Sequence, residues 1–365
     1  MHIVIEADQL NSPKYVGISN YVSQYIHHLS QANHLISVFH KNKKKLFNKY
    51  TNVFEPSLNK FPPANQPPQI LHSFTLARPK NKTLPWIQTI FDTIIEHHPQ
   101  VLQEIFPKIN SKTAHLIQRT VKVLAQQPQI IIAPSENTKK DLIAIYKIPE
   151  KKIKVIPLAP QPIFHLVSTL NKNKFLKNKN ISFPFFLFVG QRWKYKNFLT
   201  LLKAFTIYKK RVPLEGQSLK LIAVGSPSYF SPEEEIIINK NNLHNEVIIF
   251  PQVTQKDLNL FYNTAYALIY PSLYEGFGLP PLEAMSCELP VIASNSSSIP
   301  EVTGEAALLF NPEHAEQLAE IMQKILYDKP LYEKLILKGK NQIKKFNWGK
   351  ITKDTIKIYE QLLPK

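Results

Sequence analysis

Two glutamates stand eight positions apart in the segment YPSLYEGFGLPPLEAMSCELP, residues 270–290. Between Glu275 and Glu283 lie Gly276 and Gly278, and the pattern predicts a buried strand, a turn and then a helix. Glycine lets a backbone approach a ligand closely, and free N–H groups at a helix N-terminus favour phosphate. Carboxylates accept hydrogen bonds from hydroxyls, so the pattern suits a ligand with phosphate between two hydroxyl-bearing ends, such as a sugar nucleotide. Local physics leaves a second interpretation equally open, in which Glu283 only complements the helix dipole.

A second group of candidate residues follows the apolar strand Phe186 to Val189, which leads into Gly190. The loop after it supplies Arg192 and Lys196, and a helix is expected to begin near Asn197. An arginine fork and a lysine ammonium are suited to binding a diphosphate and to stabilising charge on a leaving phosphate. The lysine two positions before Lys196 competes for this role, and a lysine-rich loop also occurs on ordinary protein surfaces.

The sequence EGFGLPPLEA, followed by PVIASNSSSIPEVTGEAALLFNP at residues 290–312, resembles the signature of glycosyltransferase family 4. Members of that family are retaining enzymes with the GT-B fold. The resemblance implies that Glu275 holds hydroxyls of the transferred sugar and that Glu283 binds the ribose of the nucleotide. The resemblance also implies that the loop between the glutamates contacts the donor through Gly276, Phe277, Gly278 and Leu279. Of these, Gly278 and Leu279 would offer backbone amides.

The loop that follows residue 189 carries a further part of the resemblance. Family members show a glycine, an arginine two positions later and a lysine six positions later, which match Gly190, Arg192 and Lys196. The resemblance therefore assigns Arg192, Lys196 and Glu275 as catalytic residues, with both cations also binding the donor. It implies transfer without a metal or other cofactor, in which the leaving phosphate itself takes the acceptor's proton.

Other positions match the family less completely. Contacts to the nucleotide base are expected near Val253, but Gln252 replaces the usual glycine there. Gly17 matches a glycine loop that approaches the donor phosphates, although a helix-entry turn explains this glycine nearly as well. Phe91 precedes Asp92 where many relatives carry histidine, so the role of that histidine is not transferable to this chain.

Two polar residues of the first half have simple structural interpretations. Ser135 is expected to cap the N-terminus of a helix. His72 follows an apolar run and is placed to point toward the ligand, but a lone histidine is more often a satisfied structural residue.

The apolar runs predict two α/β domains. Short runs such as His2 to Ala7 and Ile130 to Pro134 alternate with helical stretches in the first half, and a second series of strands opens at Phe183. We expect two Rossmann-like, doubly wound parallel sheets facing a cleft, with ligands beyond the carboxyl ends of the strands. The expected divisions are an acceptor-binding domain (1–180), a nucleotide-sugar domain (181–347) and a final helix (348–365) that the family packs on the first domain.

The net charge of +18 is unevenly distributed. Residues 1–180 hold 24 Lys and Arg against 9 Asp and Glu, whereas residues 181–365 hold 21 against 18. Two lysine and asparagine clusters, at 41–49 and 171–180, are expected to be solvated loop or linker. They are suited to an anionic membrane surface, and simple solubility explains them equally well. No nucleic-acid motif accompanies the charge, so nucleic acid is not an expected partner.

The remaining composition fits an intracellular enzyme. The single cysteine, Cys287, excludes an internal disulfide and is expected to pack in a helix. No apolar run is long enough to cross a bilayer, and the first residues suggest a strand, so a cytoplasmic protein is expected, peripheral on the membrane if the lysines dock there.

The resemblance thus implies a hexosyltransferase of the mannose or glucose type, acting from a GDP-, UDP- or ADP-sugar on a glycan or lipid-linked acceptor in surface polysaccharide synthesis. Three alternatives stay open: a GT-B hexosamine epimerase, a catalytically silent GT-B scaffold, and a basic membrane- or RNA-binding module.

Overall fold

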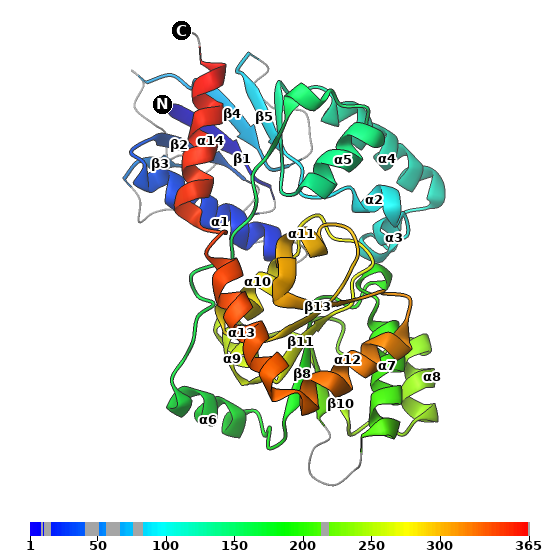
Figure 1. Ribbon diagram of the computed structural model, residues 1–365. Helices are drawn as coiled ribbons and strands as arrows, with labels where there is room; N and C mark the ends of the chain where they lie inside the picture. Colours follow the sequence, from blue (N-terminus) through cyan, green and yellow to red (C-terminus); the bar gives the residue numbers. More distant parts are fainter. Residues whose placement is uncertain are drawn as a thin grey trace. The chain divides into compact units, whose positions relative to one another are not determined.

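The computed structural model describes residues 1–8, 10, 16–40, 51–55, 66–75, 83–212 and 219–363. The chain forms two compact units: Met1–Gln161 with Phe346–Lys365, and Pro162–Lys345 (Figure 1). The division falls between residues 161 and 162 and not near 180, so residues 162–180, which the sequence suggested for the first domain, lie in the second unit. The first unit is therefore built from both ends of the chain.

The first unit contains a seven-stranded parallel sheet in the order β3-β2-β1-β4-β5-β6-β7. Its elements in chain order are β1 (His2–Glu6), α1 (Val16–Gln31), β2 (Leu35–Phe39), β3 (Val53–Phe54), β4 (Ile70–Ser73), β5 (Trp86–Thr89), α2 (Ile94–His97), α3 (Val101–Ile105), α4 (Ser111–Ala125), β6 (Ile130–Ala133), α5 (Glu136–Ala144), η2 (Glu150–Lys152), β7 (Ile153–Val155) and α14 (Trp348–Leu362).

The second unit contains a six-stranded parallel sheet in the order β10-β9-β8-β11-β12-β13. Its elements are α6 (Thr169–Asn178), β8 (Phe185–Val189), η3 (Lys194–Lys196), α7 (Phe198–Arg211), β9 (Lys220–Val224), α8 (Pro232–Lys240), β10 (Val247–Phe250), α9 (Gln255–Thr264), β11 (Ala267–Tyr270), α10 (Leu279–Ser286), β12 (Val291–Ser294), α11 (Ile299–Thr303), η4 (Gly304–Ala306), β13 (Ala307–Phe310), α12 (Ala315–Tyr327) and α13 (Lys329–Ile343). The expected pair of parallel α/β sheets is confirmed.

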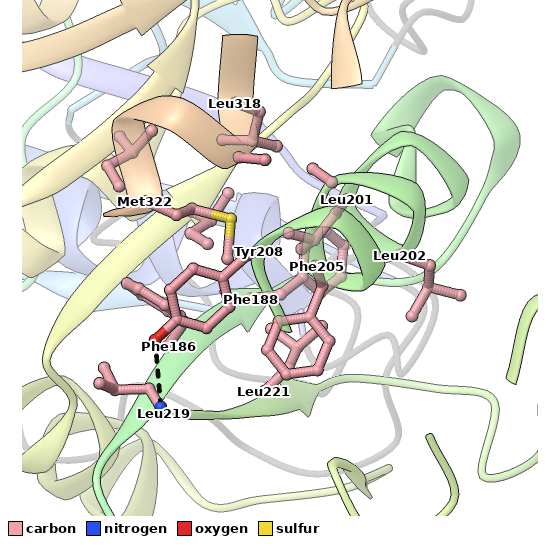
Figure 2. Packing of buried hydrophobic residues seen from close by; sticks show 14 of the residues in the cluster. Phe186, Phe188, Leu201, Leu202, Phe205, Tyr208, Leu219, Leu221, Leu318 and Met322 are labelled. Carbon is pink, nitrogen blue, oxygen red and sulfur yellow. Dashed lines mark hydrogen bonds between the residues drawn. The ribbon is translucent and has the colours of Figure 1, made fainter. Parts of the chain in front are cut away.

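The core of the second unit explains why its strands read as unbroken apolar runs. Every residue of β8 and β11 is buried, as expected for parallel strands covered on both faces. Figure 2 shows one side of this core, where Phe186 of β8 and Phe205 of α7 pack with Met322 of α12. The hydroxyl of Tyr208 accepts a hydrogen bond from Leu219 N at 3.1 Å, so this buried oxygen has a partner. Burial of each phenylalanine, leucine or methionine side chain in this core contributes about 1.5–3 kcal/mol to the free energy of folding.

One of the two lysine clusters forms a helix and not the expected loop. Residues 169–178 are α6, whose N-cap Ser168 accepts a hydrogen bond from Asn171 N. Phe175 is buried against Phe261 of α9, with ring centroids 4.9 Å apart, and this contact holds the helix on the unit. The other cluster, 41–49, lies outside the described residues.

The last helix, α14, packs against α1 in the first unit, as Figure 1 shows in red and blue. Asn347 caps it by accepting a hydrogen bond from Lys350 N at 2.8 Å. Its buried face includes Trp348, whose indole N–H donates to Pro160 O at 3.0 Å, and Tyr359. The final helix thus packs on the first unit, as the family resemblance implied.

Candidate functional site

The two loops that carry most of the candidate residues leave the second sheet side by side. From β8 the chain builds outward to β9 and β10, and it then returns to add β11 next to β8. The loops after β8 and after β11 therefore start at adjacent carboxyl ends. Ligands of doubly wound sheets bind beyond this switch point. Gly190 lies directly after β8, and the loop with Glu275 follows β11.

Lys196 and Glu275 meet at the switch point. Lys196 Nζ lies 2.5 Å from Glu275 Oε1, and each side chain is 13% exposed. Lys196 Nζ also lies 3.4 Å from the Tyr270 hydroxyl and over the rings of Tyr195 and Tyr270, at 5.0 and 5.4 Å from their centroids. An ammonium has three donors and a carboxylate about four acceptor sites, so both groups retain capacity for an anionic or hydroxylated ligand.

Glu283 lies on α10, the helix that follows the glycine turn. Gly278 is its N-cap and has a φ of +105°, a conformation that favours glycine. Pro280 and Pro281 lack N–H groups, so only Leu279 and Leu282 present donors in the first four helical positions. Any anion at this helix end must therefore rely partly on the loop before it.

The Glu283 carboxylate accepts a hydrogen bond from the Tyr262 hydroxyl, with 2.8 Å between Oε2 and the phenol oxygen. Burial raises the pKa of Glu283 to about 7, and the bond from Tyr262 acts in the opposite direction. A carboxyl group with this pKa changes charge near neutral pH. Sequence reasoning missed Tyr262, because nothing in its position on α9 indicates a partner 21 residues away.

Serines at the end of β12 and directly after it hold the glycine loop. Ser298 Oγ lies 2.8 Å from the carbonyl oxygens of both Glu275 and Phe277, so its one proton can serve either. Ser297 Oγ accepts a hydrogen bond from Glu275 N at 2.8 Å, while Ser294 Oγ donates to Ser272 O at 2.5 Å. Serine hydroxyls thus hold the backbone of the loop at several points. Its residues Gly276 and Phe277 are buried.

Arg192 does not present the free guanidinium that the sequence suggested. Its side chain is 1% exposed and pairs with Glu234 of α8, which is 5% exposed. Nε lies 3.3 Å from both carboxylate oxygens, Nη1 donates to Pro227 O at 2.9 Å, and Nη2 donates to Tyr229 O. The planar group also lies over the ring of Phe230. As placed, Arg192 supports the loop between β9 and α8, whereas Lys196 reaches Glu275.

The loop expected to contact the nucleotide base follows β10, at the same edge of the sheet but two strands away from β8. Val253 is half-buried and Gln252 is exposed. The next residue, Thr254, caps α9 by accepting a hydrogen bond from Asp257 N at 3.1 Å.

The candidate residues of the first unit say little about how a ligand is bound. Gly17 is the second residue of α1, and a Cβ built there meets nothing within 4 Å. The preceding residues 11–15 are outside the described part. Ser135 caps α5 by accepting a hydrogen bond from Thr138 N at 3.0 Å, which confirms its expected role.

His72 is a satisfied structural residue. It is fully buried, its Nδ1 lies 2.7 Å from the Tyr359 hydroxyl, and its Nε2 lies 2.7 Å from Thr89 Oγ1. Burial lowers its pKa to about 3, so the ring is neutral. Phe91 belongs to the neighbouring aromatic cluster, with its centroid 6.1 Å from that of Phe74. The phenylalanine that replaces the family histidine therefore packs in this aromatic cluster.

Among the residues that the structure describes, no three side chains of His, Cys, Asp or Glu gather where they would hold a metal ion. Within the same ranges, every helix is too short or too polar to cross a bilayer.

Residues 171–342 match the family model described as Glycosyl transferases group 1. O-antigen chain mannosyltransferase B of Escherichia coli is 29% identical over 239 residues, 64% of this chain and 61% of that protein. O-antigen chain mannosyltransferase RfbU of Salmonella typhimurium is 28% identical over 205 residues, 56% of this chain and 53% of that protein. The chain thus spans little more than half the length of these relatives.

Solved structures resemble the whole chain. A sucrose-phosphate synthase from Thermosynechococcus elongatus has a TM-score of 0.76 at 20% identity and covers 99% of both chains. WaaG, a glycosyltransferase involved in lipopolysaccharide biosynthesis, has a TM-score of 0.72 at 13% identity, covering 98% of this chain and 99% of its own. At these identities the likeness shows the fold alone.

Proposed function

Because the chain has the GT-B fold and its residues 171–342 match the model of the glycosyl transferases group 1 family, we propose that it is a retaining hexosyltransferase. It transfers a mannose- or glucose-type sugar from a nucleotide-sugar to a glycan or lipid-linked acceptor, in surface polysaccharide synthesis on the cytoplasmic side. The observation that carries the proposal is the meeting of Lys196 and Glu275 at the switch point, with Glu283 on the following helix. The names of the O-antigen mannosyltransferases support the substrate class.

The proposed donor lies across the carboxyl edge of the second sheet. Its diphosphate competes with Glu275 for the Lys196 ammonium, since both are anions that seek the same three N–H donors. Glu275, released from the lysine, accepts hydrogen bonds from hydroxyls of the transferred sugar. Glu283 accepts hydrogen bonds from the ribose at the other end of the donor, and the amides of Gly278 and Leu279 face the phosphates.

The proposed reaction needs little covalent chemistry from the protein. The acceptor hydroxyl oxygen bonds to the anomeric carbon on the face from which the diphosphate leaves. The bond from that carbon to the phosphate oxygen breaks with its electron pair, and the hydroxyl proton passes to the leaving phosphate. Lys196 stabilises the charge on the diphosphate, and Arg192 keeps the loop between β9 and α8 in place.

Activity assays with GDP-mannose, UDP-glucose and ADP-glucose test the proposal. Lys196→Met and Glu275→Gln are expected to lower transfer by about 100-fold or more, because each removes a group that acts on the reacting donor. Lys209→Met is the matched control, since Lys209 forms a comparably half-buried pair with Glu246 at 2.8 Å in the same unit.

Proton NMR of the product then reads the anomeric configuration. An inverted product would contradict the retaining mechanism. Donor binding without turnover for every acceptor tried would instead identify a silent scaffold, and wild-type rates from both site variants would overturn the assignment of the site.

We also propose that the first unit docks on an anionic membrane surface through α4. This helix contains no acidic residue, it carries Lys112, Arg119 and Lys122, and its Leu116 and Val123 are 64% and 50% exposed. Basic and apolar side chains together suit anionic headgroups. Sedimentation with phosphatidylglycerol vesicles is expected, weakened by salt and absent with phosphatidylcholine alone.

The matched variants for this test are Leu116→Glu and Leu337→Glu. Leu337 lies on α13 of the second unit and is 61% exposed. Only Leu116→Glu should reduce sedimentation. Equal loss from both variants, or binding independent of lipid charge, would contradict docking through α4.

A further inference from the structure

Tyr262 of α9 is a buried tyrosine whose hydroxyl serves one acidic group. It is 1% exposed, and its hydroxyl donates to Glu283 Oε2 at 2.8 Å. Within the part of the chain that the structure describes, this phenol is the one hydrogen-bond partner found for the Glu283 carboxylate. The ring is held by Phe164, which meets it edge to face with centroids 5.6 Å apart. Both ends of the tyrosine are therefore fixed.

The helix that carries Tyr262 is anchored to the segment that enters the second unit. Asn259 Oδ1 accepts a hydrogen bond from His165 N at 3.2 Å. One turn later, Asn263 Oδ1 accepts from Val167 N at 3.0 Å, and its Nδ2 donates to His165 O at 2.9 Å. These contacts lie on either side of Tyr262 along α9, so the helix cannot shift without breaking them.

We propose that Tyr262 is a positioning residue for the donor's ribose, holding one oxygen of the Glu283 carboxylate and so directing the other toward the ribose hydroxyls. This inference rests on the proposed function, in which Glu283 binds the ribose. The inference adds Tyr262 of α9 to the site, a residue that lies outside the segment 270–290 in which Glu275 and Glu283 were recognised.

Besides positioning Glu283, Tyr262 affects the charge of its carboxyl group. Ribose hydroxyls donate hydrogen bonds, so the ionised carboxylate is the better acceptor. Burial raises the pKa of Glu283 to about 7, and the donated bond from Tyr262 lowers it. The other titratable groups near this pair are Tyr270 of β11, Cys287 at the end of α10, and Lys172 of α6, which acts on Cys287. Tyr262 thus extends the pH range over which Glu283 is ionised.

Calorimetric titration of the full chain with GDP and with UDP, between about pH 6 and pH 9, tests this role. Wild-type affinity is expected to fall as the pH drops through about 7. Tyr262→Phe keeps the ring against Phe164 but loses the donor, so the midpoint of this fall should move to higher pH. The variant should bind about threefold or more weakly than the wild type at pH 7. At about pH 9, where Glu283 is ionised in both proteins, a smaller deficit should remain, because the carboxylate has lost the hydroxyl that positions it.

Two further variants separate the contributions. Glu283→Gln reports the titration of the nucleotide's own phosphates, because it removes the carboxyl group. Tyr332→Phe is the matched control: its hydroxyl donates to Tyr266 O at 3.1 Å, in the same unit but away from Glu283. Of the two tyrosine variants, only Tyr262→Phe should move the midpoint.

Each outcome decides the inference. An unmoved midpoint in Tyr262→Phe, or an equal move in Tyr332→Phe, overturns the positioning role while leaving the proposed function intact. Wild-type protein that binds neither nucleotide at any pH overturns the proposed function itself, and the positioning role with it.

Discussion

Replacement of Arg192 by methionine separates a structural role from a catalytic one. The guanidinium is 1% exposed and its partner Glu234 is 5% exposed, so the substitution leaves a buried carboxylate without its counter-ion. Methionine keeps the apolar contact with the ring of Phe230, over which the guanidinium now lies. We therefore expect Arg192→Met to destabilise the second unit whether or not the arginine takes part in transfer.

The contacts of Arg192 and Glu234 set the size of the expected loss of stability. Removal of one member of a buried ion pair costs about 3–5 kcal/mol. Glu234 retains one partner, because its Oε2 also accepts the Ser231 backbone N–H at 2.8 Å in the capping box of α8. This favours the lower end, about 3 kcal/mol, which lowers the ratio of folded to unfolded second unit by a factor of about 100. Glu234→Gln, which leaves the arginine with a neutral partner, should cost less.

Guanidinium chloride unfolding is the assay, combined with hydrogen exchange of peptides from the second unit, because two compact units need not unfold together. Arg211→Met is the matched control. Arg211 lies 3.7 Å from Glu320, with side chains 38% and 65% exposed, and such a pair contributes about 0–1 kcal/mol. If Arg192→Met unfolds like the wild type and yet loses transfer, the guanidinium acts on the donor and the structural explanation is refuted.

Four other changes have defined outcomes. Ser298→Ala removes the hydroxyl that serves two loop carbonyls and should cost about 1–3 kcal/mol by chemical unfolding, with weaker donor binding by calorimetry. Gly225→Ala should cost about 3 kcal/mol or more, since the new Cβ would lie 2.1 Å from Gly190 O at a φ of +136°. The pKa of His72 is about 3 in the folded protein and about 6.5 in the unfolded chain. The stability that its neutral ring contributes is therefore fully present above pH 6.5 and is lost as the pH falls toward 3. Unfolding of the wild type at about pH 5 should therefore show a loss of about 2 kcal/mol that His72→Gln lacks. Burial raises the pKa of Cys287 to about 12, so a disulfide reagent at about pH 8 should modify it only after unfolding.

The fold and the centre of the site were predictable because their signals are local. Buried parallel strands are short apolar runs, and the order of the runs with their helices gives a doubly wound sheet. Lys196 and Glu275 each lie in the segment that follows such a strand, so their meeting at one edge follows from the topology.

The rest depends on partners far away in the chain. Arg192 looks like a ligand-binding group until Glu234, 42 residues later, is placed against it. The composition of residues 171–180 indicates a solvated loop, and α6 forms because Phe175 finds a buried place on α9. Tyr262 has no signal of its own, since only the packing of α9 against α10 gives it Glu283.

The C-terminal helix sets an order on synthesis. The second unit is one uninterrupted segment, whereas the first needs α14 from the far end of the chain. Ribosomes add about 5–20 residues per second, so translation of residues 162–345 delays completion of the first unit by about 10–40 s. During that interval Tyr25 and His72 lack the hydroxyl of Tyr359, which bonds to both. The first unit therefore stays incomplete throughout translation of the second, and its hydrogen bonds to Tyr359 are the last that it can form.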